Sequence, residues 1–203
     1  MTPSLAVTLV GRHATLTPLT MDDVPKLVAA ATEDATTYEW TVVPETAHDM
    51  EVAVSRLLEE QEGRLGVPFV TRQSETGHVV GMTRFLSLRW WFGRESPDGA
   101  EIGGTFLSAS SQRTRINTDA KLLMLGHAFD VWGVQRLDLK TDARNVRSRR
   151  AIERLGAHFD GVLRHWQPSA ARGEAGVTRD SAMYSVLPSE WPGIRASLSG
   201  RLD

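Results

Sequence analysis

The stretch EIGGTFLSASSQRTRINTDAKLLML, Glu101 to Leu125, decides the fold. It predicts three elements in a row: a strand over Ile102–Leu107, a polar loop over Ser108–Asn117 and a helix over Thr118–Trp132. The backbone N–H groups at the start of such a helix have no internal acceptor and favour an anion, typically a phosphate. Arg113 and Arg115 add positive charge to the loop. The stretch therefore indicates either a pyrophosphate-binding loop or an ordinary strand–helix turn that carries arginines.

Composition limits the classes of protein. A chain of 203 residues is expected to form one domain, residues 1–203, with its core over about residues 12–191. The net charge of −2 gives no indication of general nucleic-acid binding. The absence of cysteine excludes disulfides, thiolate metal sites and a cysteine nucleophile. The histidines and acids show no metal-ligand spacing, so we expect no metal.

Hydropathy argues against membrane association. No stretch approaches the 18 consecutive apolar residues of a membrane span, and the opening MTPSLAVTLVGRHA lacks the charge and apolar run of a signal peptide. We therefore expect a cytoplasmic protein.

The pattern before Glu101 predicts two helices and three strands. The predicted elements are a strand over Val7–Leu19, broken near Gly11, a helix that starts at Thr20 and fades near Thr36, a connector over Thr37–Pro44, a helix over Ala47–Gly63, and strands over Val67–Arg72 and Val79–Leu88. The segment Arg89–Ala100 is interpreted as a strand end followed by an exposed loop.

The pattern after the central stretch adds three strands and two helices. They are a strand over Arg136–Thr141, a helix capped by Asn145 and stopped by Gly156, a strand over His158–Gln167, a mobile loop over Pro168–Thr178, a strand over Ser181–Leu187 and a helix over Pro188–Leu198. The order predicts a mixed α/β (α+β) single domain.

Five segments in this order resemble the Gcn5-related N-acetyltransferases (GNAT), in their RimJ/RimL-like branch. They are RHATLTPLTMDDVPKL, GHVVGMTRF, AEIGGTFLS, DARNVRSRRAIERLGA with its Asn-x-x-Ser helix, and RDSAMYSVLPSEW. The resemblance implies a twisted, mostly antiparallel sheet that is flanked by helices and splayed between the family's fourth and fifth strands. It also implies acetyl-CoA as cosubstrate, with the backbone of Thr105, Phe106 and Leu107 paired to the pantetheine arm.

The cofactor loop departs from the family pattern. The family has Gln/Arg-x-x-Gly-x-Gly/Ala, and here Gln112, Arg113, Thr114, Arg115, Ile116 and Asn117 fill that frame, followed by Thr118. Both small positions hold larger residues, which either add affinity for phosphate or close the loop to the cofactor. We favour retained binding. Asn117 is expected to act either as a helix N-cap or as a cofactor contact.

The resemblance also assigns catalytic roles. The position of the family's tyrosine acid is Ile152, which cannot donate a proton, and the serine of the Asn-x-x-Ser motif is Ser148. Ser148 is expected at the thioester sulfur and Asn145 on the pantetheine arm, against the alternatives of an ordinary helical serine and a plain N-cap. Glu101 is the best candidate base, with a strand-end salt bridge as its alternative.

The acceptor is less well defined. Trp40, Trp90 and Trp91 are candidates for its binding site, although the two adjacent tryptophans could equally form a protein contact or a homodimer edge. A small-molecule primary amine is favoured slightly over a protein N-terminus. The missing glycines and tyrosine leave a second possibility, a GNAT-like acyl-CoA-binding or regulatory module without catalysis.

Overall fold

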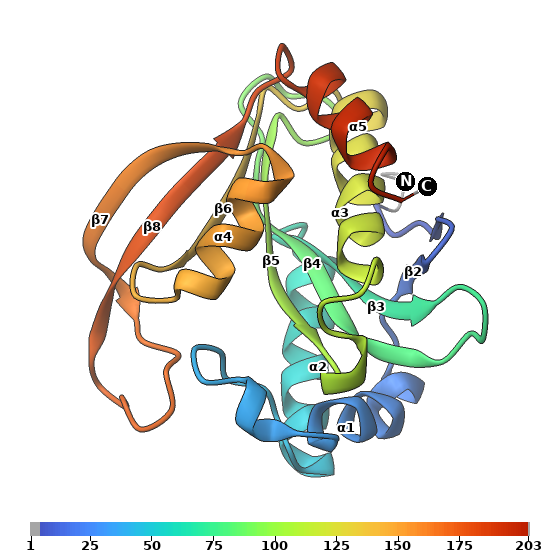
Figure 1. Cartoon of the computed structure of the whole chain (residues 1–203), viewed down its shortest axis with the longest axis vertical. Helices are drawn as coiled ribbons and strands as arrows, with labels where there is room; N and C mark the ends of the chain where they lie inside the picture. Colours follow the sequence, from blue (N-terminus) through green and yellow to red (C-terminus); the bar gives the residue numbers. More distant parts are fainter. Residues whose placement is uncertain (1–4, 203) are drawn as a thin grey trace.

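The strands join into one eight-stranded sheet in the order β1-β2-β3-β4-β5-β6-β8-β7 (Figure 1). The structure is a computed structural model that describes residues 5–202, so the first four residues of the segment tested for a signal peptide lie outside it. The strands are β1 (Leu9–Val10), β2 (Ala14–Pro18), β3 (Gly66–Gln73), β4 (Val79–Arg89), β5 (Gly99–Leu107), β6 (Arg136–Asp142), β7 (His158–Pro168) and β8 (Thr178–Val186). Every neighbouring pair is antiparallel except β5–β6, which is parallel. The predicted mixed α/β fold is confirmed.

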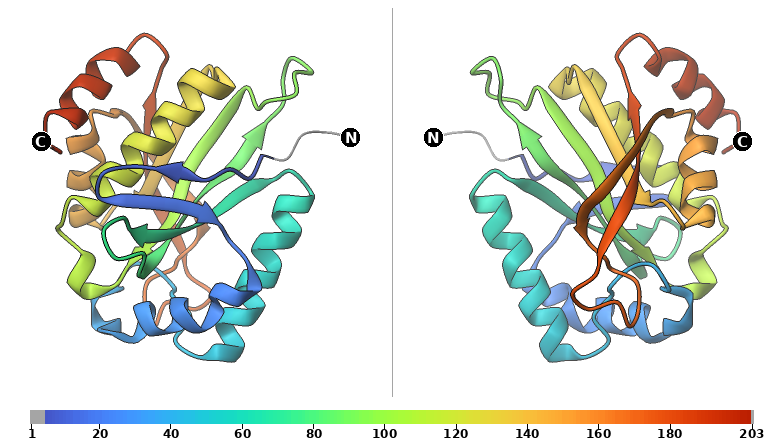
Figure 2. Two further views of the ribbon diagram at one scale, coloured as in Figure 1. Left: turned by 90° about the vertical axis from the view of Figure 1, so that its right-hand side faces the viewer. Right: turned by 90° about the vertical axis from the view of Figure 1, so that its left-hand side faces the viewer.

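Helices cover both faces of this sheet (Figure 2). They are α1 (Val24–Thr32), α2 (Ala47–Glu62), α3 (Ile116–Gly126), α4 (Val146–Leu155) and α5 (Trp191–Ser199). One buried cluster joins α1 and α2 to β3, β4 and β5 through residues such as Leu27, Met50 and Phe106. A larger cluster on the opposite face joins α3, α4 and α5 to the sheet, with Met124 and Tyr184 among its fully buried members. The sheet therefore separates two hydrophobic cores.

Several element boundaries differ from the sequence predictions. The first strand is broken around Gly11, as predicted. The helix expected to start at Thr20 is a 3-10 turn over Met21–Asp23 followed by α1, which ends at Thr32. The central helix starts at Ile116 rather than Thr118, and its last turn, His127–Trp132, is a π-helix. The terminal helix starts at Trp191 rather than Pro188, and Pro192 lies in its first turn, where a proline is favoured because its missing N–H would have no partner there.

The N-cap of α3 corrects one prediction about a site residue. Arg115 is the N-cap, with φ −70° and ψ −14°, and Asn117 is the second helical residue. The prediction of Asn117 as N-cap is therefore wrong. The start of α3 is instead held by the buried carboxylate of Asp119, whose Oδ2 accepts hydrogen bonds from the backbone of His13 (2.5 Å) and Ala14 (2.9 Å) on the adjoining β2 segment.

A β-bulge distorts the centre of β5. The register of β4 and β5 shifts between the pairs Met82–Phe106 and Arg84–Gly103, so that β5 carries an extra residue there. Gly104 lies in this bulge with φ +54°, the left-handed region that favours glycine. A Cβ at Gly104 would approach Arg84 Nε to 2.9 Å. The second of the two consecutive glycines thus serves a backbone requirement.

Candidate functional site

The central feature of the site is a fork between β5 and β6. The two strands pair only from Gly99 to Glu101 on β5, opposite Arg136 to Asp138 on β6. Beyond these three pairs the strands diverge, as the family resemblance implied, and among residues 5–202 no strand pairs with that edge of β5 from the bulge to Leu107. A free strand edge can pair with an extended ligand.

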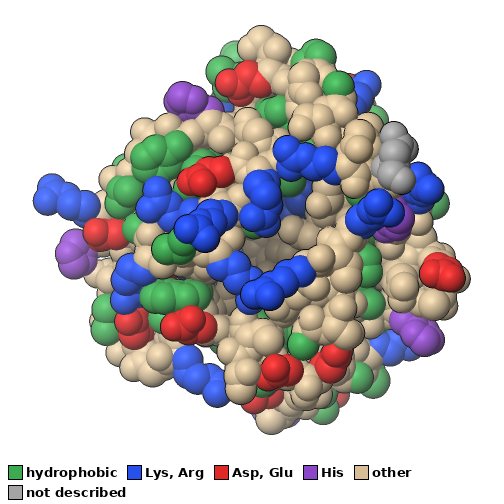
Figure 3. Space-filling view, in the orientation of Figure 1, with side chains coloured by type: hydrophobic (Ala, Val, Ile, Leu, Met, Phe, Trp, Pro, Cys, Tyr) green, Lys and Arg blue, Asp and Glu red, His purple; other side chains and the backbone are tan. Residues whose placement is uncertain are grey.

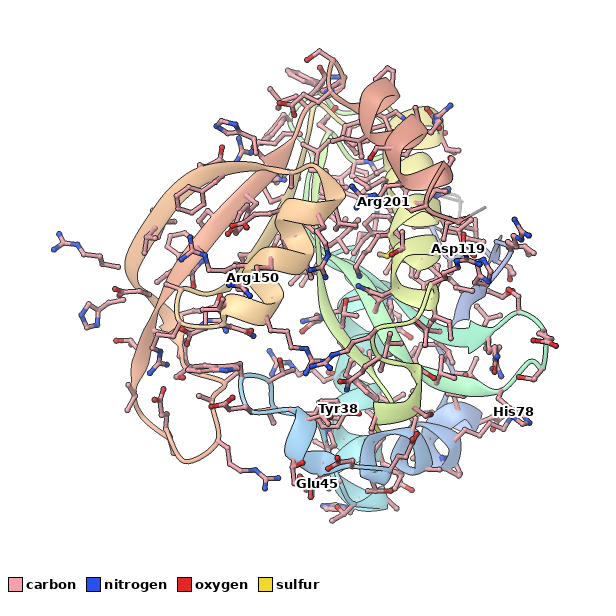
Figure 4. The ribbon with its side chains drawn as sticks, viewed as in Figure 1. Tyr38, Glu45, His78, Asp119, Arg150 and Arg201 are labelled. Atoms are coloured by element: carbon pink, nitrogen blue, oxygen red, sulfur yellow. The ribbon has the colours of Figure 1, made fainter. Side chains whose placement is uncertain are left out.

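The predicted strand contacts are placed along this edge. Thr105 is half-buried, whereas Phe106 and Leu107 are buried on opposite faces of the sheet. The carbonyl of Leu107 accepts hydrogen bonds from Tyr38 Oη (2.8 Å) and Gln112 Nε2 (3.0 Å), so it is already engaged. Tyr38 lies at the lower border of the site, beside the loop that precedes α3 (Figure 4).

The loop below the fork leads directly into α3. Ile116, Asn117 and Thr118 are its first helical residues, whose amides have no acceptor within their own helix. The Ile116 amide donates to Thr114 Oγ1 (3.3 Å). The amides of Asn117 and Thr118 therefore form the anion-attracting end of the helix.

The glycine-free loop keeps a backbone suited to an anion. Arg115, at the first small position of the family pattern, has ordinary helical dihedral angles, and its side chain is exposed. Arg113 takes the left-handed conformation, with φ +60°, and is also exposed. Arg115 also lines a hollow with Ser111, Thr114 and Ile116, and Asn117 at the second small position is half-buried.

Gln112 connects the loop to its surroundings. Its amide nitrogen donates to Thr37 Oγ1 (3.0 Å) as well as to Leu107, and its Oε1 accepts from Arg147 of α4. The loop, the connector after α1 and α4 are thereby joined across the open end of the fork.

Arginines surround a hollow in this face of the molecule. The space-filling view shows Lys and Arg side chains gathered around a central depression between the elements that border the fork (Figure 3). Exposed arginines on those elements are Arg113 and Arg115 before α3 and Arg147 and Arg150 of α4. Although the whole chain carries a net charge of −2, this face favours an anionic ligand.

The start of α4 carries the Asn-x-x-Ser motif. Asn145 is the N-cap, and its Oδ1 accepts from the backbone N–H of Ser148 (2.9 Å). The N-cap role of Asn145 is thus confirmed, and its side-chain amide group remains as a further donor. The half-buried Ser148 hydroxyl has no hydrogen-bond partner among residues 5–202. Ile152 is buried in the core, as an apolar residue at that position should be.

Glu101 lies at the point where the fork opens. Its side chain is buried, and Oε2 is 2.7 Å from Lys140 Nζ. Burial raises the pKa of Glu101, and Lys140 opposes that rise. The salt bridge considered from the sequence is therefore present, on a carboxyl group whose pKa is nonetheless raised toward the range useful to a base.

The three tryptophans do not come together. Trp40 lies near the open end of the fork, where Arg144 stacks over its ring at 4.8 Å. Trp90 and Trp91 follow the other end of β4, where Arg89 pairs with Gly99. Arg64 stacks over Trp90 at 4.3 Å, and Trp91 is 52% exposed. Only Trp40 is placed beside the diverging strands.

Sequence reasoning missed two buried cations. Lys121 of α3 is 5% exposed, and its Nζ donates to Thr83 Oγ1 (2.9 Å) and Thr105 Oγ1 (2.8 Å). Burial without a carboxylate partner lowers the pKa of Lys121 to about 7. The sequence does indicate that Lys121 is buried, because Met124 and Leu125, three and four residues later, place it on the apolar face of the helix. Arg179 of β8 is 9% exposed, and no local pattern points to it.

Comparisons with known proteins agree with this geometry. Residues 13–158 match the family described as the acetyltransferase (GNAT) domain. The chain belongs to the GNAT acetyltransferase family. This acetyltransferase is similar to a solved structure assigned as an acetyltransferase from T. thermophilus, with 31% identity over 97% of each chain and a TM-score of 0.79. No protein with curated annotation matches it at a significant level.

Two further solved structures are similar to this GNAT domain. A GCN5-related N-acetyltransferase from Brucella melitensis is 26% identical, with 99% of this chain and 88% of that chain covered and a TM-score of 0.80. RimJ of Mycobacterium smegmatis, solved with CoA-disulfide, is 20% identical, with 99% and 97% covered and a TM-score of 0.82, a likeness of fold. The resemblance to the GNAT family that the sequence predicted is confirmed, and the likeness to RimJ is one of fold.

Two classes of feature are missing from the part of the chain that the structure describes. Between residues 5 and 202, no three His, Asp or Glu side chains are grouped so that they could hold a metal ion. Over the same residues, none of the helices has both the length and the apolar character needed to cross a bilayer.

Proposed function

We propose that the protein is an N-acetyltransferase that moves the acetyl group of acetyl-CoA to a primary amine. The observation that carries this proposal is the fork, in which a free β5 edge leads to the start of α3 and its two exposed arginines. A pantetheine arm fits a free strand edge, and a pyrophosphate fits a helix N-terminus. Two structures of the same fold support the cosubstrate: RimJ was solved in complex with CoA-disulfide, and the microcin C7 self-immunity acetyltransferase MccE in complex with acetyl-CoA and AMP.

The residues at the fork suit the chemistry of acyl transfer. The amine must lose a proton before it attacks the thioester carbonyl, and the departing thiolate must gain one. Glu101 is assigned to the first proton, because its pKa is raised and it lies where the strands part. Ser148 is assigned to the second, because its hydroxyl has no partner among the described residues and lies on the opposite wall of the fork.

A clasp between two loops favours a small amine as acceptor. The β7–β8 loop meets the connector after α1: the Arg172 amide donates to the Glu39 carbonyl (3.1 Å), and its guanidinium pairs with Glu45 (2.6 Å). Glu45 is labelled at the lower edge of Figure 4. Because this clasp lies beside Trp40, it narrows the entrance to the fork. A narrow entrance hinders a folded protein more than it hinders a small molecule. The Vibrio fischeri ribosomal-protein-S5-alanine acetyltransferase, 15% identical, shares the fold alone.

Calorimetric titration tests the cosubstrate. The protein is expected to bind acetyl-CoA and CoA, with ATP as a control that shares the adenine and phosphates. Arg115→Ala should raise the Kd for acetyl-CoA roughly tenfold or more, the loss expected for a charge-assisted phosphate contact. Arg164→Ala, which removes an exposed arginine of β7, is the matched control.

Two results would contradict the proposal. Unchanged acetyl-CoA affinity in Arg115→Ala would refute the phosphate role of the loop. Absence of acetyl-CoA binding by the wild-type protein would refute the enzyme assignment and leave the fold without its expected cosubstrate. If acetyl-CoA binds, thiol release on addition of amines measures transfer directly.

A further inference from the structure

Arg179 is a buried arginine without a partner. The residue is 9% exposed, its Nε has no hydrogen-bond acceptor, and its guanidinium forms no hydrogen bond or ion pair with any residue between 5 and 202. Buried charges in proteins are normally paired, because removing them from water is costly. An unpaired buried guanidinium therefore indicates an anionic ligand that belongs beside it.

The carboxylates nearest to Arg179 are already engaged. Both carboxylate oxygens of Asp142 accept hydrogen bonds from Arg144. Oδ1 accepts from the Arg144 backbone N–H (2.9 Å) and Nε (3.0 Å), and Oδ2 accepts from Arg144 Nη2 (2.8 Å). Glu101 holds Lys140 through Oε2. Burial lowers the pKa of Arg179, although the negative charges of Asp142 and Glu101 favour its charged form. The guanidinium thus retains its donors for another acceptor.

A second unsatisfied donor lies on the same strand. Ser181 is fully buried, and its hydroxyl has no partner among the described residues. Residues two apart on a strand point to the same face of the sheet, so the Arg179 and Ser181 side chains share one face of β8. The Ser181 hydroxyl is closed off from solvent, so of these two side chains the planar guanidinium is the one that can pair with the oxygens of a carboxylate.

The fold places this pair beside the open fork. On β6, Asp142 pairs with Ser181 of β8, and the Ala143 amide continues the pairing by donating to the Asp180 carbonyl (2.9 Å). Arg179 therefore lies just past the end of β6, the strand that diverges from β5. The alternation of β6 and its pairing with β8 put Lys140, Asp142 and Ser181 on the face toward which Glu101 also points.

We propose that Arg179 binds a carboxylate of the acceptor, so that the acceptor is an amino-acid-like molecule with its amine and its carboxylate close together. This inference rests on the proposed function, since it places the amine at Glu101 and the carboxylate at Arg179. The arrangement is electrostatically consistent: a zwitterion adds no net charge to a region where Glu101, Asp142 and Glu174 balance Lys140, Arg144 and Arg179. A simple alkylamine would leave the guanidinium unpaired.

The first experiment observes Arg179 directly and does not depend on activity. The full-length protein, labelled with ¹⁵N and ¹³C in its arginine guanidinium groups, is titrated with acetate as carboxylate probe and with acetamide as neutral control. The Nε–H signal of Arg179, identified by its loss in Arg179→Lys, should shift in a saturable way with acetate and stay in place with acetamide. Failure of acetate to move this signal would overturn the inference.

The second experiment measures acceptor preference. The twenty common amino acids are offered with acetyl-CoA as free acids and as primary amides, and thiol release is followed. Wild-type protein should prefer the free acid of its best acceptor by at least tenfold in kcat/KM. Arg179→Gln should reduce that preference at least tenfold, mainly through KM for the free acid, whereas Arg164→Gln on exposed β7 should keep it.

The outcomes separate the two proposals. Transfer to amides and acids at equal rates would overturn the carboxylate site and leave the N-acetyltransferase in place. Absence of acetyl-CoA binding in calorimetry would overturn the enzyme, and the acetate titration would still decide whether Arg179 binds carboxylates. Arg179→Met, which keeps an unbranched side chain but carries no charge and no hydrogen-bond donor, replaces Arg179→Gln if the glutamine variant does not fold; its acid-over-amide preference should be lost in the same way.

Discussion

Replacing Lys121 with methionine should stabilise the protein in a pH-dependent way. Lys121 is 5% exposed, and the only partners of its ammonium among the described residues are two threonine hydroxyls. Methionine has a similar length and helix propensity, and it carries no charge into the core. The two hydroxyls keep a partner in the variant, because Thr83 Oγ1 and Thr105 Oγ1 are 2.7 Å apart.

The magnitude follows from the pKa of Lys121. Burial lowers this pKa from 10.5 to about 7, so the unfolded chain binds the proton more tightly than the folded protein does. Below about pH 7 the lysine is charged in both states, and the folded state bears the full cost of about 5 kcal/mol. Between pH 7 and 10.5 the folded state releases the proton first, so this cost falls to about 2 kcal/mol near pH 9.

Urea unfolding at several pH values measures this effect. The free energy of unfolding of Lys121→Met should exceed that of the wild type most at pH 6, and the difference should shrink by about 2–3 kcal/mol on going to pH 9. Lys26→Met, at an exposed position of α1, should show no such pH dependence. A difference between Lys121→Met and wild type that is constant from pH 6 to 9, or a variant less stable than wild type at pH 6, would refute the reasoning.

Three further substitutions, the last with a control variant, test the site and the sheet. Ser148→Ala should lower kcat roughly a hundredfold with little change in KM for acetyl-CoA, measured by thiol release; an unchanged kcat would return Ser148 to an ordinary helical role. Glu101→Gln should lower kcat and remove the acidic limb of the pH–rate profile, which the raised pKa of Glu101 moves toward neutral pH; a wild-type profile would exclude Glu101 as the base. Gly81→Ala should destabilise the protein by about 3 kcal/mol or more in urea unfolding, because φ is +151° and the new Cβ would meet the Phe106 carbonyl at 2.0 Å. Gly77→Ala, where φ is +73° and nothing lies within 4 Å of the new Cβ, should lower the free energy of unfolding by only about 1 kcal/mol. Equal losses in the two variants would show that backbone strain alone, and not the contact with Phe106, causes the destabilisation.

The sequence predicted the parts of the fold that local pattern controls. The strand before Ser108, the helix after the loop and the Asn145 cap all depend on neighbouring residues, and all are present. The N-cap of α3 was missed because Asp119 stabilises that end through the backbone of β2, more than 100 residues earlier. No local rule could supply that contact.

The parts of the site that lie in local motifs were also predictable from the sequence. The motif at Asn145 and Ser148 and the arginines of the loop were visible in the sequence, and the structure places both beside the fork. Arg179 was not visible, because its strand was expected to begin only at Ser181. The extension of β8 to Thr178 depends on pairing with β7, where Gln167 lies opposite Arg179. Arg179 also lacks a carboxylate partner because Arg144 binds both oxygens of Asp142.

The bulge in β5 explains how one strand serves both sides of the fork. In a regular strand, residues 101, 103 and 105 would all face the same side, because successive side chains alternate. The extra residue at Gly104 changes the alternation, so that Thr105 turns toward α3 and meets Lys121, while Glu101 faces Lys140 on the other side. A β5 without that residue would move the Thr105 hydroxyl to the Glu101 side and leave the buried ammonium of Lys121 with one hydroxyl instead of two. Gly104, in its left-handed conformation, therefore allows β5 to contribute both to the face that holds Glu101 and to the face that holds Lys121.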